Sequence, residues 1–233
     1  MRSHKEARIA GAFGAFALAT ALAAAPVQAF NCYSTNPGAS GTASTTTYDV
    51  TAYGGSGYFV LHSATPSSGH SIAHPFETSS TGTSFTGLGT FKGAGNSGGC
   101  SATAGTAWGT YADYRTNGVY HCASFSKSYA NTDSTSHSFD LSFRSGGCGN
   151  ISSNAWCWYF DATLTFNRTL DFSSGYVSAG GESVGASGQS IAVDYKSLYT
   201  RGSTGVYTGW QYRTTCSNSP YVVTGTADNF GVH

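Results

Sequence analysis

The residues in this chain best suited to chemistry are two glutamates that lie far apart in the sequence. Glu77 and Glu182 are the only glutamates downstream of residue 29. Two carboxyl groups about 5.5 Å apart can cleave a glycosidic bond with retention, one acting as nucleophile and the other as general acid. If the fold brings them into one cleft, the sequence predicts a polysaccharide-active enzyme with Glu77 and Glu182 as its catalytic residues.

The composition resembles that of small secreted β-jelly-roll glycosidases, which are rich in hydroxyl and aromatic side chains, poor in charge and equipped with two distant glutamates. The resemblance implies a glycoside hydrolase. A polysaccharide lyase is a second enzymatic alternative, because tyrosine and histidine can serve as its acid and base. Tyr114 and His121 can meet across a hairpin at Asn117-Gly118. Arg115 and Arg144 would then bind the uronate.

Three further motifs look chemical, but their surroundings favour turns and loops. The glycine-flanked serines Ser97 and Ser183 lack the preceding barrel of trypsin-like proteases and the strand-to-helix turn of α/β-hydrolases, respectively. His70 and His74 would share a metal on a helix, but on a strand they stand about 13 Å apart. No metal ion or other cofactor is therefore expected.

Two rows of polar and aromatic side chains suggest a binding surface instead of a catalytic site. Tyrosine, amide and guanidinium groups that alternate with apolar residues on a strand face outward, where they can stack on sugar rings or contact a partner. The candidate ligand-binding residues are Tyr207, Gln211 and Arg213 in one row, and Tyr111, Asp113 and Arg115 in the other.

These rows carry the leading interpretation, a non-catalytic extracellular protein that binds carbohydrate or a surface partner, because no catalytic constellation is complete in the sequence. An inert structural or envelope protein is a further alternative. Nucleic-acid binding is excluded, since removing Arg2, Lys5, Arg8 and Glu6 with the leader leaves eight basic and ten acidic residues without a basic cluster.

Residues 1–29 read as a secretory signal peptide. Arg2, Lys5 and Arg8 precede an alanine-rich apolar run, and Val27-Gln28-Ala29 has the shape of a cleavage site. The mature chain, residues 30–233, is then secreted and has no membrane span. In an oxidising compartment its six cysteines are expected to form three disulfides. Six cysteines allow 15 pairings, and the sequence does not choose among them. Local closure favours Cys148 with Cys157, and Cys100 could pair with Cys122, which would leave Cys32 for Cys216.

Period-two alternation of apolar and polar residues runs through the mature chain, and helical periodicity is absent. The segment Trp156–Phe166 alternates along its whole length, and Asn117-Gly118 is a strong signal for a tight hairpin. Many short strands separated by glycine-rich turns predict one all-β domain, an antiparallel β-sandwich or jelly roll stapled by disulfides, with no substantial helix after the signal peptide.

Overall fold

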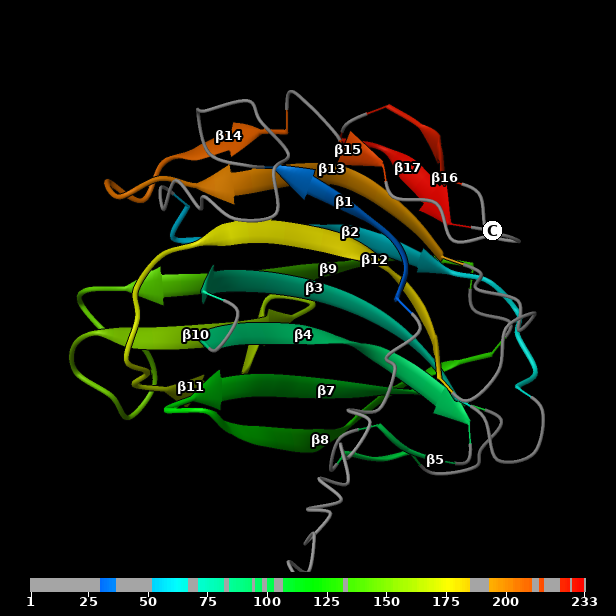
Figure 1. Cartoon of the computed structure of the whole chain (residues 1–233), viewed down its shortest axis with the longest axis horizontal. Coiled ribbons are helices and arrows are strands. Elements are labelled where there is room, and N and C mark those ends of the chain that lie inside the picture. Colours follow the sequence, from blue (N-terminus) through cyan, green and yellow to red (C-terminus); the bar gives the residue numbers. More distant parts are fainter. Residues whose placement is uncertain are drawn as a thin grey trace, which may run out of the picture.

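The computed structural model describes residues 30–36, 52–66, 71–81, 84–93, 95–97, 100–102, 107–131, 134–184, 193–210, 214–215, 223–226 and 228–232. Within these ranges every regular element is a β-strand, and the strands form two stacked antiparallel sheets (Figure 1). The predicted β-sandwich is therefore confirmed. No helix in this part of the chain is long and apolar enough to cross a membrane. The predicted signal peptide lies outside the described residues.

The front sheet in Figure 1 has seven strands. In spatial order they are β15 (Thr214–Thr215), β1 (Phe30–Asn36), β12 (Tyr176–Val184), β3 (Ser71–Thr81), β4 (Ser84–Gly93), β7 (Ala107–Thr116) and β8 (Val119–Ala130). Because β3, β4 and β7 are interior strands with neighbours on both sides, their backbones are held rigidly. Side chains that they carry on the outer face are accurately positioned relative to one another.

The rear sheet has eight strands. In order they are β11 (Thr163–Arg168), β10 (Ala155–Phe160), β9 (Ser136–Arg144), β2 (Gly54–Leu61), β13 (Val193–Arg201), β17 (Phe230–Val232) and β16 (Val223–Gly225), with β14 (Tyr207–Gly209) also paired to β13. A separate hairpin joins β5 (Gly95–Ser97) to β6 (Cys100–Ala102).

Aromatic side chains from both sheets fill the space between them. Trp108, Trp156 and Trp158 are fully buried, and the rings of Phe76 and Phe139 meet across the two sheets at 4.6 Å. Trp158 of β10 also donates its indole N–H to the carbonyl of Gly87 on β4, over 2.7 Å. The rear sheet thus holds the middle of β4 in place.

Tyr195 of β13 makes a second polar connection between the sheets. Pro75 lies in the interior strand β3, where it has no N–H to offer its neighbour β12. The Tyr195 hydroxyl lies 2.9 Å from the Pro75 carbonyl oxygen and 2.8 Å from the Gly180 carbonyl oxygen. A side chain of the rear sheet therefore bonds two backbone acceptors of the front sheet.

The segment predicted as one strand, Trp156–Phe166, is two strands joined by a tight turn. Asp161 and Ala162 have φ angles of 46° and 59°, and β10 pairs with β11 across them. This turn contains no glycine or asparagine, so the alternating pattern continues through it without a local signal that one strand ends and the next begins. The hairpin predicted at Asn117-Gly118 is confirmed, since both residues have positive φ and Thr116 pairs with Val119.

One predicted disulfide, Cys148–Cys157, is confirmed, and it closes a loop between β9 and β10. Cys122 on β8 is also disulfide-bonded. The side chains of Cys32, Cys100 and Cys216 lie outside the described part of the chain. The pairings expected of Cys122 with Cys100 and of Cys32 with Cys216 therefore stay predictions.

Candidate active site on the front sheet

Alternation along β3 divides its side chains between the core and the outer face of the front sheet. Ile72 and Phe76 belong to the main core cluster, whereas Ala73 packs in a separate small cluster with Phe91 and Tyr111. Because successive side chains of a strand point to opposite faces, Glu77 lies on the outer face with Ala73. The same alternation puts Tyr111, Asp113 and Arg115 of β7 on that face.

Pairing across the sheet aligns Glu77 with Asp113. Glu77 pairs with Gly87 of β4, and Gly87 pairs with Asp113 of β7. The middle residue of this line has no side chain. A Cβ atom added at Gly87 would lie 2.5 Å from Asp113 Oδ1 and 2.9 Å from Glu77 Cγ. These two atoms are therefore no farther apart than the two distances together, and the Asp113 carboxyl and the Glu77 side chain both border the space above one glycine.

Asp113 is held in an environment that disfavours its charge. The residue is 7% exposed, and the Tyr120 hydroxyl donates a hydrogen bond to Oδ2 over 3.2 Å. Oδ1 has no hydrogen-bond partner among the described residues. Burial raises the pKa of Asp113 to about 7, against the lowering effect of the Tyr120 hydrogen bond. Asp113 is therefore protonated over most of the acidic range.

The outer face around the two carboxyls offers aromatic and hydroxyl groups. Ser178 of β12 pairs with Glu77 and continues the line on one side, and Cys122 of β8 pairs with Asp113 on the other. Phe85 and Tyr120 contact each other at 6.0 Å between ring centroids. Carboxyl and hydroxyl groups of this kind can serve in general acid–base catalysis.

Glu182, the predicted partner of Glu77, is four residues away along the sheet. It pairs with Ala73, whereas Glu77 pairs with Ser178. At about 3.4 Å per residue, their backbones are separated by roughly 14 Å along the strands. The side chain of Glu182 is outside the described part of the chain. The register does not give these two residues the close approach that it gives Glu77 and Asp113.

The structure describes the predicted binding row on β7 completely and the other row only in part. Tyr111 and Asp113 lie on the predicted face, but both are buried rather than presented to solvent, and Arg115 donates to the Gly118 carbonyl. Tyr207 donates its hydroxyl to Asp140 of the rear sheet over 2.5 Å. Gln211 and Arg213 lie outside the described residues.

The residues considered for a lyase or a metal site lie toward the interior. Tyr114 and His121 do meet, with stacked rings 4.8 Å apart, but Tyr114 is buried against Trp158. His74, expected in a loop or an irregular strand, is buried in β3, where Nδ1 lies 3.0 Å from the Thr90 hydroxyl oxygen. Burial lowers its pKa to about 3, with a smaller effect of His62. His70 is outside the described part.

Sequence reasoning did not pair Glu77 with Asp113. Glu77 was assigned to a catalytic hypothesis and Asp113 to a binding row. The two residues are 36 positions apart in the sequence, and only the register of β3, β4 and β7 aligns them. A usable signal was the alternating glycine pattern of Gly87 and Gly89 in an otherwise strand-like segment. Glycine inside a strand often marks a close approach by other groups.

Comparison with known proteins shows a shared fold. No protein-family model and no curated protein sequence matches the chain. Two solved structures of scytalido-glutamic peptidase, one with a transition state analog inhibitor and one with a peptide-based transition state analog, are 8% identical to it with a TM-score of 0.51. They cover 80% and 88% of this chain, and in each case 98% of the peptidase chain is covered. A Bacillus licheniformis β-glucanase is 16% identical over 60% of this chain and 56% of its own, with a TM-score of 0.35.

These comparisons correct the leading interpretation from the sequence. A non-catalytic binding protein was expected because no complete catalytic constellation was visible, and this interpretation is wrong. The solved structures that share the fold are enzymes. Alternation along single strands does not reveal which residues of different strands the sheet register brings side by side, as it does Glu77, Gly87 and Asp113.

Proposed function

We propose that this protein is a hydrolase that cleaves peptide bonds, with Glu77 and Asp113 as its acid–base pair. The observation that carries the proposal is the approach of the Glu77 side chain to the Asp113 carboxyl above Gly87, with the pKa of Asp113 raised to about 7. The fold shared with scytalido-glutamic peptidase supports a peptide substrate. Paired carboxyls held in different protonation states are a recurrent arrangement in hydrolases.

The roles follow from the surroundings of each group. Asp113, protonated below about pH 7, donates its proton to the departing nitrogen of the scissile amide. Glu77 takes a proton from a water molecule, which attacks the amide carbon, and the carbon–nitrogen bond breaks. Burial disfavours a negative charge on Asp113, so we expect Asp113 to be protonated in the resting enzyme. Activity is expected to fall as pH rises through about 7.

Hydrolysis of a glycosidic bond is the second candidate. The specific observation in its favour is the carboxyl spacing, since the distances around Gly87 allow the separation of about 5–5.5 Å that a retaining glycosidase uses. In this version a carbohydrate is the substrate, and Asp113 replaces Glu182 as the partner of Glu77.

Activity assays on three glutamine or asparagine variants test both candidates. Purified protein is incubated with casein, β-glucan and xylan between pH 3 and 8, and new amino groups and reducing ends are measured. We expect cleavage of casein below about pH 7, with Glu77→Gln and Asp113→Asn each reducing the rate by about a hundredfold or more. Glu182→Gln should retain wild-type activity.

Three results would contradict this assignment. Loss of activity in Glu182→Gln together with normal activity in Asp113→Asn would restore the pair predicted from the sequence. Cleavage of none of the substrates at any pH would refute the hydrolase. Release of reducing ends without new amino groups would indicate that the substrate is a carbohydrate, as in the second candidate function. Thermal melting of each variant controls for loss of fold.

Export and processing are part of the same proposal. The protein is expected to act outside the cell, with a mature chain that begins near Phe30 and three disulfides. Sequencing the amino terminus of the secreted protein and counting its free thiols would check this, since six cysteines in three bridges leave no free thiol.

A further inference from the structure

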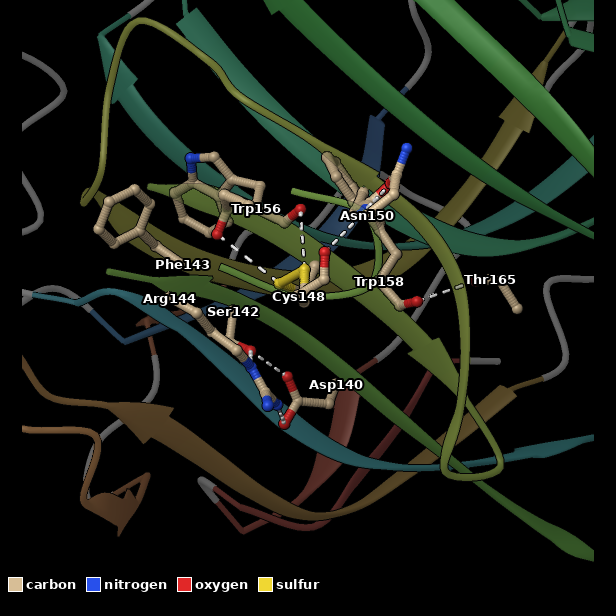
Figure 2. Close-up of a disulfide and its surroundings, with 12 residues drawn as sticks. Asp140, Ser142, Phe143, Arg144, Cys148, Asn150, Trp156, Trp158 and Thr165 are labelled. Atoms are coloured by element: carbon tan, nitrogen blue, oxygen red, sulfur yellow. Dashed lines mark hydrogen bonds and ion pairs between the residues drawn. A yellow bond between two sulfur atoms is a disulfide. The ribbon is translucent and has the colours of Figure 1, made fainter. Parts of the chain in front are cut away.

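Two consensus sites for asparagine-linked glycosylation come together at one end of the rear sheet. Asn150-Ile151-Ser152 lies in the loop closed by the Cys148–Cys157 disulfide, and Asn167-Arg168-Thr169 includes the end of β11. Figure 2 shows Asn150 beside this disulfide. Both asparagines carry the sequence signal, so their surroundings must decide which one can accept a glycan.

Asn167 donates hydrogen bonds to two other residues of the protein through its side-chain amide nitrogen. Its Nδ2 donates to the carbonyl of Cys148 over 2.6 Å and to Oδ1 of Asn150 over 2.8 Å. A carbonyl oxygen can only accept, so the nitrogen of Asn167 must face Cys148. Gly149, with a φ of +56°, passes so close that an added Cβ would lie 2.8 Å from this nitrogen. Both protons of the Asn167 amide are therefore used.

The amide of Asn150 is oriented the opposite way. Its oxygen accepts from Asn167, which leaves its nitrogen directed away from that contact. Asn150 and Ser152 are both exposed, whereas Asn167 is half-buried. The turn that carries Asn150 is fixed by reciprocal backbone hydrogen bonds between Cys148 and Ile151, of 2.9 and 3.0 Å. The acceptor nitrogen is thus presented on a rigid, exposed turn.

We propose that Asn150 is an N-glycan acceptor and that Asn167 is a structural clamp closed to this modification in the folded protein. In the transfer, Nδ2 of the asparagine forms a bond to C1 of an oligosaccharide carried on a polyprenyl diphosphate. The bond from C1 to the diphosphate oxygen breaks, the diphosphate leaves on its lipid, and Nδ2 loses one proton. Asn150 can lose a proton without breaking a contact, whereas Asn167 would lose one of its two hydrogen bonds.

Secretion of the full chain from a yeast that glycosylates exported proteins tests the assignment. Glycopeptide mass spectrometry on the folded, secreted fraction should find a glycan on Asn150 and none on Asn167. Two variants remove one consensus site each while keeping both asparagines. Ser152→Ala should abolish the glycan completely, and Thr169→Ala should leave its occupancy and mass unchanged. Occupancy of Asn167, or an unmodified Asn150 in the wild type, would overturn the proposal.

The clamp is tested separately by thermal melting of the same secreted proteins. Asn167→Ala removes both donors, and we expect a fall in Tm of several degrees relative to Thr169→Ala, which keeps them. Equal melting temperatures for Asn167→Ala and Thr169→Ala would refute the structural role. Because Thr169→Ala lacks the same consensus site, a missing glycan cannot account for a difference between the two variants.

Discussion

Two aspartates on the outer faces of the two sheets show how differently a carboxyl group can be supported. On the rear sheet, Asp140 accepts from Ser142 and Tyr207, each over 2.5 Å, and Arg144 lies 3.8 Å away. Figure 2 shows Asp140 with Ser142 and Arg144. On the front sheet, Asp113 is buried and accepts a hydrogen bond from Tyr120 on Oδ2, whereas Oδ1 has no partner among the described residues.

The difference separates a carboxylate held by several donors from one suited to the proposed proton transfer. Donors on both oxygens hold Asp140 in one position and occupy its lone pairs. Asp113 keeps Oδ1 without a hydrogen bond from the described residues, next to Glu77, and its raised pKa makes it a proton donor at acidic pH. A carboxyl that is buried but incompletely hydrogen-bonded costs stability, and such a cost is typical of active sites.

The residues beside each aspartate allow the largest expected effect to be tested. Gly87 is the cross-strand neighbour of Asp113, and Ser56 is that of Asp140. Gly87→Ala would place a methyl carbon 2.5 Å from Asp113 Oδ1 and push the carboxyls apart. We expect hydrolytic activity to fall by roughly ten- to a hundredfold, because misplacement by about 1 Å can cost that much. Ser56→Ala, which creates the same residue beside Asp140, should leave activity unchanged, and equal losses would contradict the comparison.

Replacing the two aspartates by asparagine should change the free energy of unfolding at pH 8 in opposite directions. Between about pH 4 and 7 the folded protein keeps a proton on Asp113 that the unfolded chain has released, so the free energy of unfolding falls as pH rises. Asp113→Asn removes this slope and should be more stable than wild type at pH 8, by on the order of a few kcal/mol.

Asp140→Asn supplies the contrast in the same unfolding experiment. The amide loses one acceptor oxygen and the charge that faces Arg144, so we expect a loss of about 1–3 kcal/mol at pH 8. Urea titrations at pH 4, 6 and 8 would measure both effects. His74 contributes the opposite slope, because its lowered pKa makes the folded protein lose stability as pH falls below about 6.5. An Asp113→Asn variant destabilised at pH 8 would argue against a raised pKa.

The smallest effect concerns the two tyrosines that donate to the aspartates. The Tyr120 hydrogen bond lowers the pKa of Asp113, so Tyr120→Phe should raise that pKa further and move the alkaline limb of activity upward by less than about one pH unit. Tyr207→Phe removes the donor to Asp140 and should leave the pH profile in place. Measuring the hydrolysis rate of each variant from pH 5 to 9 would show whether the alkaline limb moves. A downward shift in Tyr120→Phe would contradict the hydrogen bond's direction.

The sequence predicted the fold and the faces of single strands, but not the site. Alternation correctly put Tyr111 and Asp113 on one face of β7, and Asn117-Gly118 correctly predicted a hairpin. Within the described residues, errors arose where no local signal exists. The Asp161-Ala162 turn lacks glycine, and the alignment of Glu77 with Asp113 depends on long-range register. Register follows from the packing of whole sheets, which no short segment encodes.

The hydroxyl of Tyr195 has a consequence for how the chain can be divided. The hydroxyl lies within hydrogen-bond distance of the carbonyl oxygens of Pro75 and Gly180, both in the front sheet. Tyr195 belongs to β13, which is synthesised after β12, so these contacts form only when the later part of the chain is present. A fragment ending at residue 184 would contain the candidate carboxyls and yet leave the Gly180 carbonyl without this donor. The part of the chain that carries the candidate carboxyls is therefore not expected to be separable from the rest by truncation.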